Sequence, residues 1–498
     1  MKTADSTAVV KRKTRSGCFT CKSRRVKCDE TKPSCWRCIS TKRICEGYPT
    51  PPQHSLSFDS LTDEERRAFL FFRSRTAHRI FGHRDAEIWL PTILQLGHKE
   101  APVKHALTAL ASLHESMEPD DACISIRRSE KHAQLSSQIL ALKHYTSAIK
   151  SVQTESPHSS FRPDTVLILC ILFVCFEQFR SGDAACLLHL RAGFRLLYWW
   201  RNSTTTYSKL HEYSRPTLDL INNQITPTLQ RLRVQFSLCM DSRHALKDLG
   251  VPLCLPFPTI PSSYPSLDSA RNDYDRVMNH IFSSLEREDT TGGESPKPAL
   301  STLLRQWKNA LDFSDFSEES LTLQECTKKL LNLYYHVSVI VTETYSSKDE
   351  TIFDGYTDHF QTAVELAENI TDMDRNELQG FSLLFSFDLG ITPPMFLVAS
   401  RCRHPLIRRR AMNLMIQSPF YHGAWQDRYS GLCAQRIIKI EELEAGFLVD
   451  DINVPEQNRI RKISADIEET QSEISMQFRR WPFTVDAPVN TTIVKLQS

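Results

Sequence analysis

Glycine is scarce in this sequence, at fifteen of 498 residues, and the short motifs of catalytic and nucleotide-binding loops are missing. The chain has no G-x-S-x-G, no phosphate-cradling glycine loop, no dinucleotide fingerprint and no H-E-x-x-H grouping among its seventeen histidines. These patterns supply the tight turns, close backbone approaches and metal ligands that many enzymes need. Their absence argues against those enzyme classes, and we expect a protein that is not an enzyme.

Long apolar runs are missing as well. The longest, from Val166 to Phe176, has eleven residues, whereas a membrane-spanning helix needs about 20. This run therefore predicts a buried helix, and we expect a soluble protein with no membrane partner. The N-terminus has no apolar stretch of the signal-peptide type. We therefore expect a reducing compartment, where disulfides are rare.

Positive charge is concentrated at one end of the chain. Residues 1–48 carry thirteen Lys or Arg against four acidic residues, a net charge of +9. The other 450 residues carry 48 basic and 55 acidic side chains, a net charge of −7. A basic segment on a mildly acidic body is typical of a protein that binds a polyanion through that segment.

Six of the fifteen cysteines lie in the same basic segment, at Cys18, Cys21, Cys28, Cys35, Cys38 and Cys45. Their spacing, C-x2-C-x6-C-x6-C-x2-C-x6-C, repeats with an offset of seventeen residues. A thiolate set of this kind favours zinc, which takes four ligands. Two zinc ions need eight coordination positions, which six thiolates fill if two of them bridge. The spacing therefore predicts a binuclear cluster that supplies the folding free energy of a segment too short to bury a core. The other nine cysteines are expected to be buried free thiols.

The two halves of this repeat differ in charge. The first interior contains Lys22, Arg24, Arg25 and Lys27, and the second contains Lys42 and Arg43. Arginine matches O6 and N7 of guanine in the major groove, so we expect Arg24 and Arg25 to read bases. The four remaining cations suit phosphates.

Residues 15–48 resemble the fungal binuclear-cluster (zinc cluster) transcription factors across the whole segment, with no ligand missing. The resemblance implies that Cys18 and Cys35 bridge the two zinc ions, and that Arg24 and Arg25 read a CGG-type triplet. It also implies a nuclear location, double-stranded DNA as partner, and regulation of a metabolic or secondary-metabolite gene set. The alternative function is a zinc-stapled helical adaptor that does not bind DNA.

The rest of the chain is predicted to form an all-α body, since no run of alternating apolar residues is apparent. We expect a basic arm at 1–17, the DNA-binding domain at 18–48, a proline-rich linker at 49–60 and a helical regulatory domain at 61–498. Thr62, followed by three acidic residues, predicts a helix start. Further helices are expected at 163–180, 184–200, 300–313, 317–346, 356–373, 395–416 and 429–448, with a loop at 288–298.

Two segments of the body, Ala141–Tyr145 and Phe387–Ala411, resemble the helical regulatory region of the same family. Residues 56–79 lack the heptads of a dimerising coiled coil, so a homodimer and a monomer both stay open. Contacts with the transcription machinery or a small-molecule effector also stay open.

Two charged segments of the body each have two interpretations. The run Arg408-Arg409-Arg410 is expected to be a solvated helix face, with a second nucleic-acid patch as the alternative. Residues 312–319 fit either an acidic loop or an activation segment.

Overall fold

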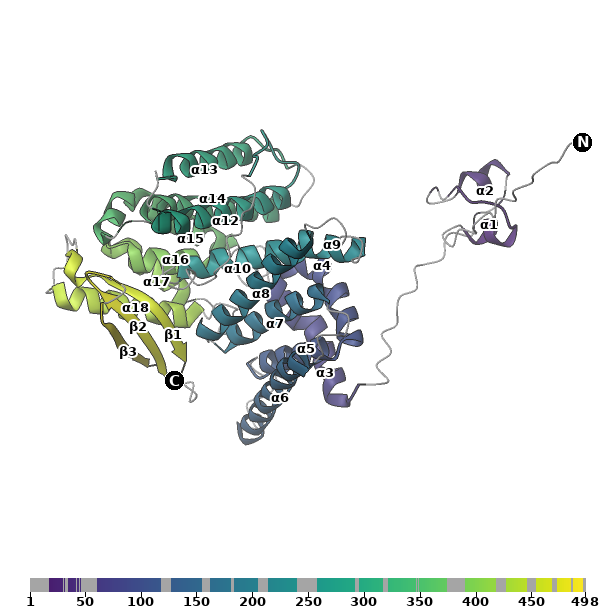
Figure 1. Ribbon diagram of the computed structural model, residues 1–498, viewed down its shortest axis with the longest axis horizontal. Helices are drawn as coiled ribbons and strands as arrows, with labels where there is room; N and C mark the ends of the chain where they lie inside the picture. Colours follow the sequence, from purple (N-terminus) through teal and green to yellow (C-terminus); the bar gives the residue numbers. More distant parts are fainter. Residues whose placement is uncertain are drawn as a thin grey trace, which may run out of the picture. The chain divides into compact units, whose positions relative to one another are not determined.

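The computed structural model forms two compact units, Met1–Leu61 and Thr62–Ser498, whose helices and strands are labelled in Figure 1. The described residues are 18–29, 31, 35–41, 43, 45, 61–117, 127–154, 162–180, 183–204, 214–239, 258–291, 295–316, 321–345, 347, 349–373, 390–417, 427–445, 454–467, 473–484 and 487–495. The first unit contains two short helices, α1 (Phe19–Ser23) and α2 (Trp36–Ser40).

The second unit begins with helices packed around α5. The elements are α3 (Asp63–Phe71), the π-helical turn η2 (Phe72–Thr76), α4 (Ala77–Lys99), α5 (Ala101–Glu115) and α6 (Arg127–Thr154). The predicted helix start is confirmed, because Thr62 caps α3. The Thr62 hydroxyl accepts from the amide of Glu65, whose carboxylate accepts from the amide of Thr62. This reciprocal capping box satisfies amides that the first helical turn leaves without partners.

The apolar run forms α7 (Pro163–Phe179), in which every residue except Val166 is buried. It packs against α8 (Asp183–Thr204), which confirms the two predicted helices; residues 181 and 182 between them lie outside the described residues. The last turns of α8 carry two neighbouring tryptophans. Trp200 is buried but Trp199 is exposed.

The middle of the unit is also helical. It consists of α9 (Arg215–Leu220), the π-helical turn η4 (Ile221–Ile225), α10 (Thr226–Cys239), α12 (Leu267–Thr291), α13 (Lys297–Asp312), α14 (Leu321–Thr344), the 3-10 turn η6 (Glu350–Tyr356) and α15 (Thr357–Met373). The loop predicted at 288–298 is wrong at both ends, because α12 continues to Thr291 and α13 begins at Lys297. Residues 317–319 of the acidic segment lie outside the described residues.

A single helix was predicted at 395–416, but the structure has two, α16 (Thr392–Arg401) and α17 (Pro405–Ile416). Pro405 cannot donate a backbone hydrogen bond, and the residue before a proline avoids the helical conformation. His404 accordingly has φ −64° and ψ 117°. The next helix, α18 (Asp427–Ala445), packs on both.

The prediction that Arg408 lies on a solvated face is wrong. Its side chain is fully buried, and its Nη2 atom donates to Glu441 Oε2 at 2.7 Å. Glu441 Oε1 accepts from Arg403 Nη2 at 2.9 Å and from the amide of Ile460 at 2.9 Å. Arg409 and Arg410 are partly exposed and pair with Glu442 and Glu368, respectively. None of the three arginines is therefore an unpaired cation for nucleic acid.

The C-terminal segment corrects the prediction that the chain lacks strands. After the 3-10 turn η8 (Glu456–Asn458), an antiparallel sheet in the order β1-β2-β3 forms from β1 (Ile460–Ile467), β2 (Glu473–Arg480) and β3 (Val489–Lys495). In β2, Ile474, Met476 and Phe478 alternate toward the interior. The sheet packs against α8 and α18. The second unit is thus mostly helical, as predicted, but carries a small sheet.

Within the described residues, the structure contains no helix with the length and apolar character needed to cross a membrane.

Candidate metal centre and nucleic-acid interface

The two halves of the cysteine repeat adopt the same backbone geometry. Cys18 and Cys35 each cap a short helix, with Sγ accepting from the amide three residues on at 3.3 Å in both halves. At the other end, the amide of Val26 donates to the carbonyl of Cys21 at 3.1 Å, and that of Arg43 donates to the carbonyl of Cys38 at 3.0 Å. The seventeen-residue repeat of the sequence is therefore a repeat of hydrogen bonds.

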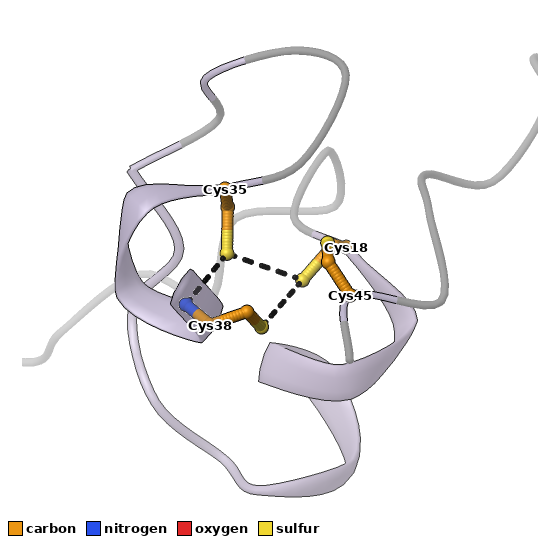
Figure 2. Close-up of side chains that lie close together, drawn as sticks. All are labelled: Cys18, Cys35, Cys38 and Cys45. Carbon is orange, nitrogen blue, oxygen red and sulfur yellow. Dashed lines mark hydrogen bonds between the residues drawn. The ribbon is translucent and has the colours of Figure 1, made fainter. Parts of the chain in front are cut away.

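All six cysteines converge on the centre of this unit. Their sulfur atoms form two groups of four, one made of Cys18, Cys21, Cys28 and Cys35, and the other of Cys18, Cys35, Cys38 and Cys45. Within each group all sulfur atoms lie within 4.8 Å of one another. The groups share Cys18 and Cys35, the same pair that the family resemblance implies as bridging ligands. Figure 2 shows the second group, with Cys18 and Cys35 facing each other.

The sulfur spacing fits tetrahedral metal sites. Cys35 Sγ lies 3.6 Å from both Cys18 Sγ and Cys21 Sγ in the first group, and Cys18 Sγ lies 3.8 Å from Cys38 Sγ in the second. A tetrahedron with Zn–S bonds of about 2.3 Å has edges of about 3.8 Å. Burial raises the pKa of Cys18 to about 12 and raises that of Cys21 and Cys35 as well. Buried thiols of this kind lose their protons when a metal cation binds them as thiolates, so the donor set fits zinc.

Asp29 joins the two halves, and its role was not predicted. Its Oδ1 accepts from the amide of Arg37 at 3.0 Å, and its Oδ2 accepts from the amide of Trp36 at 2.9 Å and from the Thr31 hydroxyl. The Thr31 hydroxyl and these two amides hold the pKa of Asp29 well below its ordinary value. Asp29 thereby caps α2, whose third amide is capped by Cys35. The signal available in the sequence was an Asp directly after the third cysteine.

The predicted DNA-facing residues of the first half surround the end of α1. Lys22, Arg25 and Lys27 are exposed and Arg24 is half-buried. Arg24 Nη1 donates to Thr41 Oγ1 at 3.3 Å, which holds its guanidinium against the second half.

Arg25 has φ 57°, the left-handed conformation that usually requires glycine. The helix ends there with the amides of Arg25 and Val26 donating to the carbonyls of Lys22 and Cys21, which is the Schellman pattern with arginine in the glycine position. Holding a non-glycine residue in this region costs of order 1 kcal/mol. Such strain concentrates at functional sites.

The second half contributes Arg43, which is exposed. Lys42 lies outside the described residues. Two apolar side chains on α2, Trp36 and Ile39, are also exposed, and the sequence patterns did not single them out.

Two segments of the chain match models of known protein families. A family model described as "Fungal Zn(2)-Cys(6) binuclear cluster domain" matches residues 16–55, and one described as "Fungal specific transcription factor domain" matches residues 69–217. Two segments of the chain therefore match models of a fungal zinc-cluster domain and of a fungal transcription factor domain. The zinc-cluster match contains all six cysteines. The second match contains Ala141–Tyr145, whereas Phe387–Ala411 lies outside it.

Similar proteins are transcription regulators by name. The aspercryptin biosynthesis cluster-specific transcription regulator atnN of Emericella nidulans is 29% identical over 39% of this chain and 36% of its own length. The transcription regulator lscL of Purpureocillium lilacinum is 25% identical over 41% of this chain and 50% of its own. The lysine biosynthesis regulatory protein LYS14 of Saccharomyces cerevisiae is 62% identical over 37 residues, 7% of this chain and 5% of its own length. The matched segments thus cover at most half of these relatives, and no solved structure matches.

Proposed function

We propose that this protein is a sequence-specific, DNA-binding regulator of transcription by RNA polymerase II. In this proposal the six cysteines hold two zinc ions, and Arg24 and Arg25 read a CGG-like triplet in the major groove of double-stranded DNA. The observation that carries it is the pair of four-sulfur groups sharing Cys18 and Cys35, with basic side chains around the end of α1. The family model that matches residues 69–217 is described as a fungal specific transcription factor domain, which supports a regulator rather than an enzyme.

We assign different tasks to the basic residues in this proposal. The hydrogen bond to Thr41 restrains the guanidinium of Arg24, and the left-handed backbone of Arg25 sets the direction in which that side chain leaves the main chain. A preorganised planar fork loses little side-chain entropy on pairing with guanine. Lys22, Lys27, Lys42 and Arg43 would contact phosphates, which position the domain without reading sequence.

The remaining features follow from the same proposal. A DNA target implies the nucleus. The proposed domains are a basic arm at 1–17, the zinc-cluster domain at 18–48, a linker at 49–60 and the regulatory domain at 61–498. The names of relatives that regulate biosynthesis support a metabolic or secondary-metabolite gene set. A second copy of the chain, the transcription machinery and a small-molecule effector are candidate partners of the regulatory domain.

The test is a binding titration of the zinc-loaded chain against a CGG-containing duplex and a scrambled duplex. Affinity for both should fall linearly with the logarithm of salt concentration, by a slope of about −0.9 per phosphate contacted. Arg24→Ala or Arg25→Ala should cost about 1–3 kcal/mol on the CGG duplex and far less on the scrambled one.

Arg37→Ala is the matched control, since it removes an equal charge from the exposed face of α2. It should weaken binding to both duplexes to a similar extent, and by less than Arg24→Ala or Arg25→Ala weakens binding to the CGG duplex. If the chain bound neither duplex at low salt, the proposal would be refuted and a zinc-stapled adaptor would be favoured. Equal selectivity of the Arg24→Ala, Arg25→Ala and unaltered chains would refute the assignment of the base-reading residues.

A further inference from the structure

A third group of metal-ligating side chains lies in the helical unit, away from any cysteine. Glu65 of α3, His105 of α5 and His144 of α6 have ligand atoms that all lie within 4.8 Å of one another. The Nδ1 atoms of the two histidines are 2.9 Å apart. The three helices pack side by side, with α5 against both α3 and α6. We call these residues the His–Glu triad.

The carboxylate of the triad is buried and held in place. Glu65 is only 7% exposed. Its Oε2 accepts from the amide of Thr62 at 3.0 Å, and its Oε1 lies 3.3 Å from Lys104 Nζ. Although burial opposes ionisation, the Thr62 amide and Lys104 lower the pKa of Glu65. A negatively charged oxygen, oriented by a backbone amide, therefore faces the two imidazoles, as ligating carboxylates are in metal sites.

Burial favours the neutral form of both imidazoles. Burial lowers the pKa of both His105 and His144. A neutral imidazole has one N–H and one lone pair. The facing Nδ1 atoms can share one proton, or both can offer lone pairs to a cation while each Nε2 carries the proton.

A histidine pair alone does not indicate a metal, and this chain contains a comparison. His336 and His359 have the same Nδ1–Nδ1 distance of 2.9 Å and the same ring-centroid distance of 5.0 Å as His105 and His144. Yet among the described residues the only groups of three or more converging ligands are the two cysteine groups and the His–Glu triad. The buried carboxylate is what distinguishes the triad.

We propose that Glu65, His105 and His144 bind one divalent transition-metal ion, with zinc as the physiological candidate. Two imidazoles and a carboxylate suit zinc, and three protein ligands leave a fourth position for water or a small ligand. Lys104 now occupies one side of Glu65, and its partly exposed side chain can turn to solvent when the ion binds. The ion ties α3, the first helix of the unit, to α5 and α6, and makes their packing dependent on metal.

The experiment counts metal on the full chain by native mass spectrometry, with Co²⁺ titration to separate the two kinds of site. Co²⁺ bound by thiolates has a charge-transfer absorption that Co²⁺ bound by nitrogen and oxygen lacks. Binding of Co²⁺ to the triad should therefore add no charge-transfer absorption. The unaltered chain should bind one ion more than His144→Ala. Glu65→Gln should lower the affinity for that ion by more than about tenfold. A loss of this size occurs even when the replaced residue only orients a metal ligand.

Two controls keep the result interpretable. Glu65→Gln retains the capping box, because glutamine also serves at that position, so α3 should still form. His336→Ala removes one member of the comparison pair and should bind as many ions as the unaltered chain. Equal metal counts in the unaltered, Glu65→Gln and His144→Ala chains would overturn the proposal, as would an equal loss in His336→Ala. Either result is independent of the cysteine cluster and of DNA binding.

Discussion

Replacing Glu441 by glutamine should detach the C-terminal sheet from the helices. Glu441 is fully buried and accepts from Arg403, Arg408 and the amide of Ile460. Glutamine keeps the shape but removes the charge that compensates two fully buried guanidinium groups. Breaking a buried ion pair on one side costs about 3–5 kcal/mol, because the remaining charge is left without compensation.

The remaining contacts limit this loss without preventing it. The contacts that do not involve Glu441 remain in the variant. Arg403 still pairs with Glu350 Oε2 at 3.1 Å, and Arg408 still contacts the carbonyl of Ala399 at 3.3 Å and Glu442 at 3.9 Å. Glu442 provides a matched control one residue away. It pairs with Arg409 across a partly exposed surface, and such pairs contribute less than about 1 kcal/mol.

Amide hydrogen exchange of β1 and β2 is the suitable assay, since it reports local opening in a chain too large for two-state unfolding. A cost of about 3–5 kcal/mol corresponds to exchange faster by roughly 100- to 5,000-fold. Glu442→Gln should change exchange by less than about tenfold. If the two variants protected the sheet equally, the buried network would not be what holds it.

Further predictions concern pH, packing and the strained arginine. Arg403 and Arg408 more than offset the burial of Glu441 and lower its pKa, so its contribution to stability is complete above the ordinary glutamate pKa. The protection factors of the sheet amides, which correct for the pH dependence of intrinsic exchange, should fall as pH falls below that value, and protection factors that stay constant through the acid range would contradict this. Gly97→Ala should lower the free energy of unfolding by about 1–3 kcal/mol, because an added Cβ would lie 2.7 Å from Leu107 Cδ1. Gly355→Ala meets nothing within 4 Å and should leave the thermal midpoint unchanged, so equal midpoints for both variants would refute the clash. Arg25→Gly should relieve backbone strain and keep the zinc count, yet lose duplex affinity; unchanged affinity in a binding titration would exclude a DNA contact by this guanidinium.

The sequence predicted the parts of the molecule that depend on local pattern. The six-cysteine spacing indicated one compact unit, and the run at Val166–Phe176 indicated the buried helix α7. Capping chemistry located the start of α3. Each of these signals lies within a few residues of the structure it specifies.

The missed features depend on contacts between distant residues or on weak patterns. The solvated face predicted for Arg408 failed because its partner Glu441 lies 33 residues away in α18. The alternation in β2 was present in the sequence, but β1 is interrupted by a register shift between Lys462 and Ser464. In β3 the apolar residue Ile493 faces outward, so no consistent period marked the sheet. The His–Glu triad likewise joins three helices and has no local motif.

The central claim is that two zinc ions, bound by six cysteines, hold a pair of arginines in position to read DNA. Selection of duplexes from a random pool by the zinc-loaded chain, with and without chelator, tests it most directly. The account predicts enrichment of a common CGG-like triplet that disappears when zinc is removed, and the spacing of repeats will show whether two chains bind together. Enrichment of no sequence, or the same enrichment after complete zinc removal, would contradict it.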